Sequence, residues 1–331
     1  MSKIKGLLGI GNALVDILIP IDNDGLLDEL GLIKGGMILI DREMVANILE
    51  RTKAVKLRRS SGGSVANSIS GLARLGLPTG FVGTIGDDEF GVFFNSDMTL
   101  NSTKTHLFKG SRETGKSIAL ISTDTERTLA TYLGAAGELH RCQLSDDMFK
   151  SFDYILLEAY MIPNHQMSEK VLKLAKKANI KIAIDFSSFN VVDENRDYLD
   201  RIVREYVDIV FANEEEARIF TNEENPDRAL AKIAKKCDLG VVKCGIQGSL
   251  IQRNNQQYHI EAIPVKAIDT TGAGDLYNSG FFYGLLHGYS IEVCGKLGAI
   301  LGGKVVEVIG SKMNEEKWEE VWNLIKNCLA R

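Results

Sequence analysis

Closely spaced cysteine or histidine pairs, which disulfide-bonded and zinc-binding proteins use, are absent from this sequence. Its five cysteines are far apart and form no C-x-x-C pair: Cys142, Cys237, Cys244, Cys294 and Cys328. The five histidines form no H-x-x-x-H pair either. This spacing argues against a disulfide framework and a zinc knuckle, and it suits a reducing compartment.

Long apolar runs are also absent. No segment approaches the roughly 20 unbroken apolar residues of a membrane span. The N-terminal stretch MSKIKGLLGIGNALVDILIP is interrupted by Gly9, Gly11, Asn12 and Asp16, and no small-residue cleavage site follows it. We interpret it as a first β-strand and expect a soluble, cytoplasmic protein.

The sequence also has no excess of positive charge. The net charge is −5, which gives no electrostatic reason to expect nucleic acid or an anionic membrane as a partner. With 331 residues, 44% hydrophobic and 25% charged, the chain can bury a large core. No internal repeat or long linker divides it, so we predict one main domain spanning residues 1–331.

Short apolar runs alternate with helical patterns along the chain. We predict strands at 7–19, 80–86, 154–160, 180–186, 207–213 and 239–245, and helices at 64–77, 167–180, 197–206 and 225–236. In the first helix Val65, Ile69, Leu72 and Ala73 share one face. Such alternation predicts an α/β fold with a largely parallel sheet and helices on both faces.

Two β-rich segments break the alternation. Residues 16–41 contain short strand and turn patterns, and residues 112–134 predict a hairpin: KSIALIS, the turn TDTER, then TLATYLG. We expect the two segments to pair into a small sheet that acts as a lid, with Gly35, Gly36 and Gly134 as places where it flexes.

The stretch GSRETGKS, Gly110 to Ser117, fits the pattern of a phosphate-binding P-loop. A P-loop joins a buried strand to a helix whose N-terminus receives phosphate. Here the following residues, IALIS, predict a strand, and the preceding KTHLFK is poorly suited to a buried strand. We interpret the match as false.

A stronger candidate anion site is DTTGAGDLYNSGFFYGLLHG, Asp269 to Gly288. Its glycine-rich turn leads into an apolar helix, so backbone N–H groups and the helix dipole converge on one point. Asp275 lies in the first helical turn. Two interpretations stay open: a base that accepts a proton from a substrate hydroxyl, or an acid that only stabilises the helix start.

The same stretch resembles the C-terminal signature of the ribokinase (PfkB-type) family of sugar and nucleoside kinases. GNALVDIL, SSGGSVANSISGLARLG, ANEEEA and VVKCGIQGS resemble further family segments in the right order, so the resemblance covers nearly the whole chain. It implies a three-layer α/β/α fold with a small β-sheet lid. It also implies transfer of the γ-phosphoryl group of Mg²⁺·ATP to a primary hydroxyl.

The resemblance also implies roles for individual residues. The implied catalytic base is Asp275, and the implied anion hole is Gly272, Ala273 and Gly274. The implied contacts to the phosphoryl acceptor are Asp16, Gly62, Gly63 and Asn67. The implied ATP-side residues are Asn213, Glu216, Lys243, Gly245, Gly248 and Thr270, with Glu216 organising Mg²⁺ through water. A monovalent-cation site near Asp269 and Thr271 is a family-level hypothesis that these residues alone do not establish.

Each assignment has a structural alternative. Asp16 interrupts an apolar run and could be a charge that protects an edge strand from aggregation. Asn67 could be an ordinary polar helix residue. Asn213 followed by Glu216 is also a capping box, which starts a helix. Lys243 could be a strand-end lysine whose ammonium group reaches solvent. GIGNAL lacks the third glycine of a dinucleotide fingerprint and leads into more strand.

Two segments lean toward a nucleoside acceptor. Residues 24–41 resemble the longer lid segment of adenosine-kinase-like members, and residues 123–136 resemble their lid hairpin. Asp16 would then bind the ribose 2′- and 3′-hydroxyls while the 5′-hydroxyl faces Asp275. The alternative acceptor is ribose, fructose or a sugar acid.

Other protein classes stay open. A P-loop NTPase would lose nucleotide binding on Lys116→Ala, and a non-catalytic regulator would bind ATP without acceptor-dependent ADP release. The sequence leaves the oligomeric state open between monomer and homodimer, because an exposed lid edge is a natural dimer seam.

Overall fold

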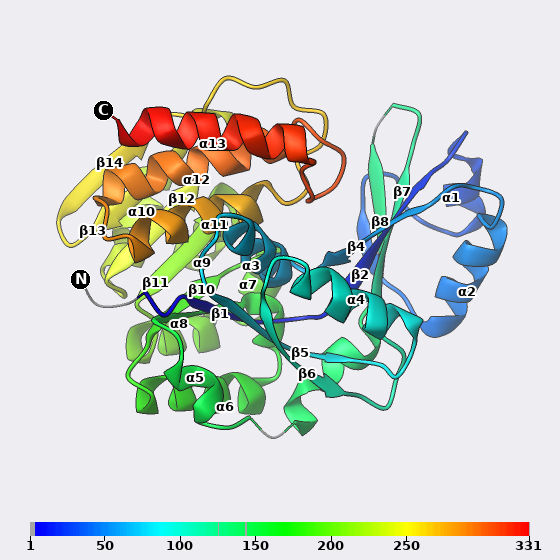
Figure 1. Cartoon of the computed structure of the whole chain (residues 1–331), viewed down its shortest axis with the longest axis horizontal. Helices are drawn as coiled ribbons and strands as arrows, with labels where there is room; N and C mark the ends of the chain where they lie inside the picture. Colours follow the sequence, from blue (N-terminus) through cyan, green and yellow to red (C-terminus); the bar gives the residue numbers. More distant parts are fainter. Residues whose placement is uncertain (1–3, 125, 143, 331) are drawn as a thin grey trace.

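The strands form two separate sheets in the computed structural model, which describes residues 4–124, 126–142 and 144–330. Figure 1 shows the large sheet among the helices, with the smaller sheet extending from one side of it. In spatial order the large sheet contains β14 (Gln256–Ile260), β13 (Ser249–Arg253), β12 (Leu239–Lys243), β11 (Ile209–Asn213), β10 (Lys181–Asp185), β9 (Tyr154–Glu158), β1 (Leu7–Ile10), β5 (Thr79–Ile85) and β6 (Lys104–Lys109).

The seven strands from β12 to β6 pair in parallel, and β13 and β14 add an antiparallel hairpin at one edge. The α-helices among the described residues are α1 (Gly25–Glu29), α2 (Arg42–Arg51), α3 (Ser64–Arg74), α4 (Glu89–Thr99), α5 (Asp147–Lys150), α6 (His165–Lys177), α7 (Phe189–Glu194), α8 (Arg196–Glu205), α9 (Glu214–Thr221), α10 (Pro226–Ala234), α11 (Ala273–Leu286), α12 (Ile291–Val305) and α13 (Glu315–Leu329). The predicted α/β class and the mostly parallel sheet are confirmed.

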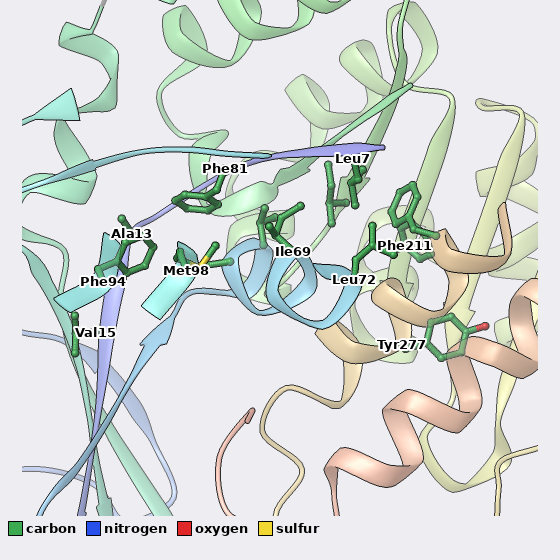
Figure 2. Close-up of a cluster of buried hydrophobic side chains, with 14 of the residues drawn as sticks. Leu7, Ala13, Val15, Ile69, Leu72, Phe81, Phe94, Met98, Phe211 and Tyr277 are labelled. Carbon is green, nitrogen blue, oxygen red and sulfur yellow. The ribbon is translucent and has the colours of Figure 1, made fainter. Parts of the chain in front are cut away.

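Two hydrophobic clusters lie on opposite faces of the large sheet because side chains alternate along a strand. Side chains of α3 and α11 pack on one face, where Phe211 of β11 lies edge-on to Phe281 with ring centroids 5.3 Å apart. Figure 2 shows this cluster, with Ile69 and Leu72 of α3 beneath the strands. Side chains of α6, α8, α9 and α10 cover the other face. Both faces are buried, so the central strands are apolar throughout.

The smaller sheet has the order β3 (Met37–Leu39), β8 (Arg127–Tyr132), β7 (Gly115–Ile121), β2 (Leu14–Pro20) and β4 (Arg58–Gly62). The predicted hairpin is confirmed, since β7 and β8 pair antiparallel. Both predicted β-rich segments contribute strands, but residues 16–41 also contain helix α1. Strand β4 was not predicted, because RRSSG has no apolar alternation.

The prediction of one strand over residues 7–19 is wrong. The chain leaves the large sheet after Ile10 and enters the smaller sheet at Leu14, so β1 and β2 belong to different sheets. Gly11 permits the crossing, because a Cβ there would lie 2.5 Å from an oxygen of Glu158. An apolar pattern cannot reveal such a crossing, since both strands are buried.

The stretch that fits the P-loop pattern has no helix after it, because Gly115 begins strand β7. KTHLFK before it does form a strand, β6, which lies at the edge of the large sheet. This strand is only partly buried, in line with the expectation that KTHLFK is poorly suited to a buried strand. The stretch therefore lacks the strand–loop–helix arrangement of a P-loop, as predicted. In the part of the chain that the structure describes, no helix has the length and apolarity needed to cross a membrane.

Candidate active site

A cavity of about 500 Å³ lies between the two sheets, next to the carboxyl ends of β9, β10, β11 and β12. Ligands of open parallel sheets bind at this edge. The smaller sheet contributes one wall of the cavity, and the N-terminal turns of α3 and α11 contribute another.

Asp275 lines this cavity from the first turn of α11. Its Oδ1 accepts a hydrogen bond from Ser64 Oγ (2.7 Å), and its Oδ2 accepts one from Asn67 Nδ2 (3.0 Å). Asn67 is itself fixed, because its Oδ1 accepts from Ser311 Oγ at 2.9 Å. The carboxylate is thus held by α3, a helix more than 200 residues away in the sequence.

The surroundings of Asp275 fit a base better than a simple helix-start acid. Burial raises the pKa of Asp275 to about 6, although the hydrogen bonds from Asn67 and Ser64 oppose the shift. An acid placed only for the helix dipole would have a lowered pKa. Gly272 precedes the helix with φ = +77°, and Ala273 and Gly274 line the cavity beside Asp275.

Asp16 lines the cavity from β2. Burial raises the pKa of Asp16 to about 7, against the positive charges of Lys312 and Arg127. Strand β2 lies between β7 and β4, so the alternative that Asp16 protects an edge strand is wrong. Gly62 lies against the carboxylate: a Cβ at this position would be 2.1 Å from Asp16 Oδ1.

Gly63 marks the entry to α3 and also lines the cavity. Its φ is +99°, and a Cβ there would lie 2.3 Å from the carbonyl oxygen of Asn12. Only glycine fits this turn without strain. Glycine is therefore required at the two positions for different reasons. Gly63 adopts a backbone conformation with positive φ, and Gly62 leaves space for the Asp16 carboxylate.

Asn213 and Glu216 form the predicted capping box of α9, and both also line the cavity. Asn213 Oδ1 accepts from the Glu216 backbone N–H, and Glu216 Oε2 accepts from the Asn213 N–H, each at 2.8 Å. Burial raises the pKa of Glu216 to about 7, and the neighbouring Asp185 carboxylate adds to the rise. The two interpretations of this pair are compatible.

Lys243 lies at the end of β12 with its side chain 15% exposed, and it lines the cavity. Its ammonium group pairs with Asp185 rather than extending into solvent, so the alternative of a strand-end lysine that only reaches solvent is wrong. Its Nζ donates to Asp185 Oδ2 at 2.8 Å. Gly245 lines the cavity as well.

Four predicted site residues do not line the cavity: Gly62, Gly248, Thr270 and Gly272. Gly248 closes the turn after β12 with φ = +89°, and a Cβ there would lie 1.9 Å from the carbonyl oxygen of Ile260. Thr270 is exposed, and its carbonyl oxygen accepts from the Ala273 N–H. Gly272 packs against Ser311.

Several residues of this cavity were not predicted from the sequence, above all Glu158 and Asp185. Each follows a run of apolar residues and ends a buried parallel strand. Glu158 Oε1 accepts from both the backbone N–H (2.8 Å) and Nδ2 (2.6 Å) of Asn12, and burial raises the pKa of Glu158 to about 7. An acid directly after a buried parallel strand is the signal that would have revealed both residues.

Arg127 of β8 also lines the cavity and was missed. Its guanidinium forms an ion pair with Asp269 and donates to Thr271 Oγ1 at 2.9 Å. These contacts join the smaller sheet to the loop that precedes α11. The pairing of Arg127 with Asp269 depends on tertiary structure, so no local pattern announces it.

Together, the fold and the cavity define an α/β protein with a partly buried carboxylate at a helix N-terminus. The family model of the pfkB family carbohydrate kinases matches residues 32–318. The chain belongs to this family. It is therefore an ATP-dependent phosphotransferase with an alcohol group as acceptor.

Relatives with more specific names fall into two groups. The chain is 28% identical over 312 residues to 5-dehydro-2-deoxygluconokinase of Clostridium beijerinckii, covering 88% of this chain and 91% of that protein. Among solved structures it is similar to adenosine kinase from Sinorhizobium meliloti, with a TM-score of 0.86, 32% identity, and 96% and 98% of the two chains covered. A probable sugar kinase from Rhizobium etli gives a TM-score of 0.88 at 30% identity, covering 98% and 99%.

Replacing Lys116 by Ala tests the P-loop alternative directly. Lys116 is buried, with its Nζ 4.6 Å from the centroid of the Phe90 ring and 3.2 Å from Glu113 Oε2. We expect ATP affinity, measured by calorimetry, to stay near wild type, while thermal unfolding reports a loss of about 1–3 kcal/mol of stability. Loss of ATP binding by a folded variant would restore the P-loop interpretation.

Proposed function

We propose that this chain transfers the γ-phosphoryl group of Mg²⁺·ATP to a primary hydroxyl of a sugar acid, with Asp275 as the base. The observation that carries the proposal is the Asp275 carboxylate, which two side chains of α3 hold at the N-terminus of α11 inside the cavity. A base in this position can take the proton of an acceptor hydroxyl as that hydroxyl attacks phosphorus.

The first turn of α11 supplies the stabilisation of the migrating group. The N–H groups of a helix's first turn have no partners within the helix. The Ala273 N–H donates to the Thr270 carbonyl oxygen, so the next donor, the Gly274 N–H, is the one that can donate to phosphoryl oxygens. Charge spreads over these oxygens in the transition state, where preorganised donors have the greatest effect.

The ATP side of the cavity fits a magnesium nucleotide. Glu216 offers carboxylate oxygens there, which suit a hard cation, whereas the Asp185 carboxylate is engaged by Lys243, Asn278 and the Ser187 N–H. Among the described residues no group of three or more histidine, cysteine, aspartate or glutamate side chains forms a metal cage. Mg²⁺ commonly binds one or two carboxylates together with phosphates and water, and the bound ion would neutralise the phosphate charge.

The acceptor side combines an acid with a guanidinium group. Asp16 of β2 can bind two hydroxyls of a polyol, and Arg127 of β8 lies in the same wall of the cavity. A guanidinium group is suited to an acceptor carboxylate. The name of the Clostridium beijerinckii relative, a kinase of a sugar acid, supports this acceptor over the nucleoside that the sequence favoured first.

A nucleoside is the second candidate, because the smaller sheet also gives the cavity an apolar wall. Leu14, Leu18, Leu129 and Leu133 line it, and Met37 lies at its edge strand. Such a surface can pack against a flat base. The adenosine kinase of Sinorhizobium meliloti supports this candidate.

The smaller sheet is a lid in this proposal. It carries Asp16 and Arg127 and lies over the cavity, so its approach to α11 would enclose the acceptor. Enclosure excludes the water that would otherwise hydrolyse ATP.

The function is tested by measuring ADP release from Mg²⁺·ATP with 5-dehydro-2-deoxygluconate, ribose, fructose, adenosine, inosine and guanosine. We expect release that depends on the sugar acid. Release with adenosine and not with the sugar acid would overturn the acceptor and keep the mechanism. ATP binding without release in any reaction would contradict the kinase proposal.

The pH profile gives a separate test. The base acts only when it is ionised, so activity must fall as the pH falls through the pKa of Asp275, which burial raises to about 6. Asp16, Glu158 and Glu216 have pKa values raised to about 7 by burial, so the observed midpoint belongs to the group as a whole. We expect kcat/KM for the acceptor to show an acid limb centred between pH 6 and 7. A flat profile down to pH 5, with circular dichroism reporting a folded protein, would contradict the assignment.

A further inference from the structure

The ammonium group of Lys243 lies directly beside the first turn of α11. A Cβ added to Gly274 would be 3.0 Å from Lys243 Nζ, so the glycine leaves room for the lysine. This is the helix turn at which the proposed function puts the migrating phosphoryl group. The lysine reaches it from the end of β12, on the opposite side of the cavity from the smaller sheet.

Asp185, the partner of Lys243, is fixed by one side chain and one backbone N–H group. Asp185 Oδ2 accepts from Lys243 Nζ at 2.8 Å and from Asn278 Nδ2 at 2.6 Å, while Asp185 Oδ1 accepts from the Ser187 N–H at 2.8 Å. Asn278 belongs to α11 and is fully buried. The contacts therefore connect the end of β10, the end of β12 and the helix that carries Asp275.

Positive charge is scarce where the phosphates of ATP would lie. Among the described residues that line the cavity, the cationic side chains are Arg127 and Lys243, whereas the acidic ones are Asp16, Glu158, Asp185, Glu216 and Asp275. Arg127 is on the smaller sheet and pairs with Asp269. Lys243 is thus the cation on the side of α9 and β12.

We propose that Lys243 is a catalytic residue that binds the γ-phosphoryl group at the N-terminus of α11, and that Asp185 and Asn278 position its ammonium group. The inference rests on the proposed kinase function and adds a residue to it. In the reaction a bond forms between the acceptor oxygen and the γ-phosphorus, and the bond from that phosphorus to the ADP oxygen breaks. The acceptor proton goes to Asp275, and Lys243 donates hydrogen bonds without changing its protonation.

Charge and burial support this role over a purely structural one. Burial acts to lower the pKa of Lys243, but the Asp185 and Glu216 carboxylates outweigh it, so the lysine stays charged. Buried ion pairs stabilise a fold little compared with packed apolar side chains. Lys181, at the other end of β10, illustrates the contrast, since its side chain is 56% exposed although its partner Asp208 is largely buried.

The experiment compares Lys243→Met with the double variant Asp185→Asn/Lys243→Met, using Lys181→Met as the matched control. Lys243→Met leaves a buried carboxylate without its cation and so lowers the melting temperature. The double variant removes that unpaired charge, so the melting temperature recovers toward wild type. We expect kcat to fall about 10²- to 10³-fold in both variants. The control keeps wild-type kcat.

Binding supplies a readout that does not depend on turnover. We expect Lys243→Met and the double variant to bind the ATP analogue AMP-PNP at least about tenfold more weakly, as a charge-assisted hydrogen bond requires. Affinity for ADP, which lacks the γ-phosphate, stays near wild type.

Three results would overturn the assignment: recovery of kcat in the double variant, wild-type kcat in Lys243→Met, or equal effects on AMP-PNP and ADP. If the wild-type protein releases no ADP with any acceptor, the proposed function fails. The comparison of AMP-PNP with ADP then still decides whether Lys243 binds the γ-phosphate.

Discussion

Replacing Asp275 by Asn is expected to lower kcat about 10³-fold, the usual contribution of a positioned base. The fold should persist, because the new amide can accept from Asn67 and donate to Ser64, whose hydroxyl can reverse its role. ATP affinity should stay near wild type, since the substitution removes proton acceptance and leaves the backbone of α11 unchanged. Steady-state kinetics and calorimetry with the purified variant check both expectations.

Asp197→Asn is the matched control for Asp275. Asp197 is an exposed acid in the first turn of α8, so its replacement tests the effect of a helix-start acid alone. We expect wild-type kcat from this control. If folded Asp275→Asn keeps kcat within about threefold of wild type, Asp275 is a helix-start acid and the base assignment is wrong.

Replacing Asp16 by Asn is expected to reduce kcat/KM for the acceptor at least about 10²-fold. A hydrogen bond to a charged group contributes about 1.5–3 kcal/mol, and the carboxylate can bind two hydroxyls. The loss should fall mainly on the acceptor KM, while the KM for ATP changes little, because Asp16 lies on the smaller sheet, away from Asn213 and Lys243.

Asp124→Asn is the control for this second variant. Asp124 belongs to the turn between β7 and β8, where its side chain is 59% exposed and paired with Lys34. We expect it to leave both KM values unchanged. If the Asp16→Asn enzyme has a normal acceptor KM and a raised KM for ATP, then Asp16 binds ATP, and the assignment of the acceptor to the smaller sheet is wrong.

Local patterns predicted those parts of the molecule whose geometry is set within a few residues. The β7–β8 hairpin follows from two alternating runs around a polar turn. The capping box of α9 follows from Asn213 and Glu216, which lie three residues apart. The glycine-rich start of α11 likewise sets the place of Asp275 without help from the rest of the chain.

Local patterns did not predict the place where the chain passes from one sheet to the other. Residues 7–19 have one continuous apolar character, yet they serve two sheets, because Asn12 bonds to Glu158 on a distant strand at the crossing. Strand β4 was missed because its position beside β2 depends on pairing and not on its own residues.

The sequence by itself determined the fold class, the family resemblance and the individual residues Asp275, Asn67, Asp16 and Lys243. Only the tertiary structure decided which residues hold them in place. Ser64 and Asn67 donate hydrogen bonds to Asp275, and Asp185 accepts one from Lys243. Gly62 leaves room for the Asp16 carboxylate. The physical reason is distance along the chain. Periodicity and turn chemistry act over a few residues, whereas a carboxylate in the cavity takes its partners and its pKa from elements tens to hundreds of residues away.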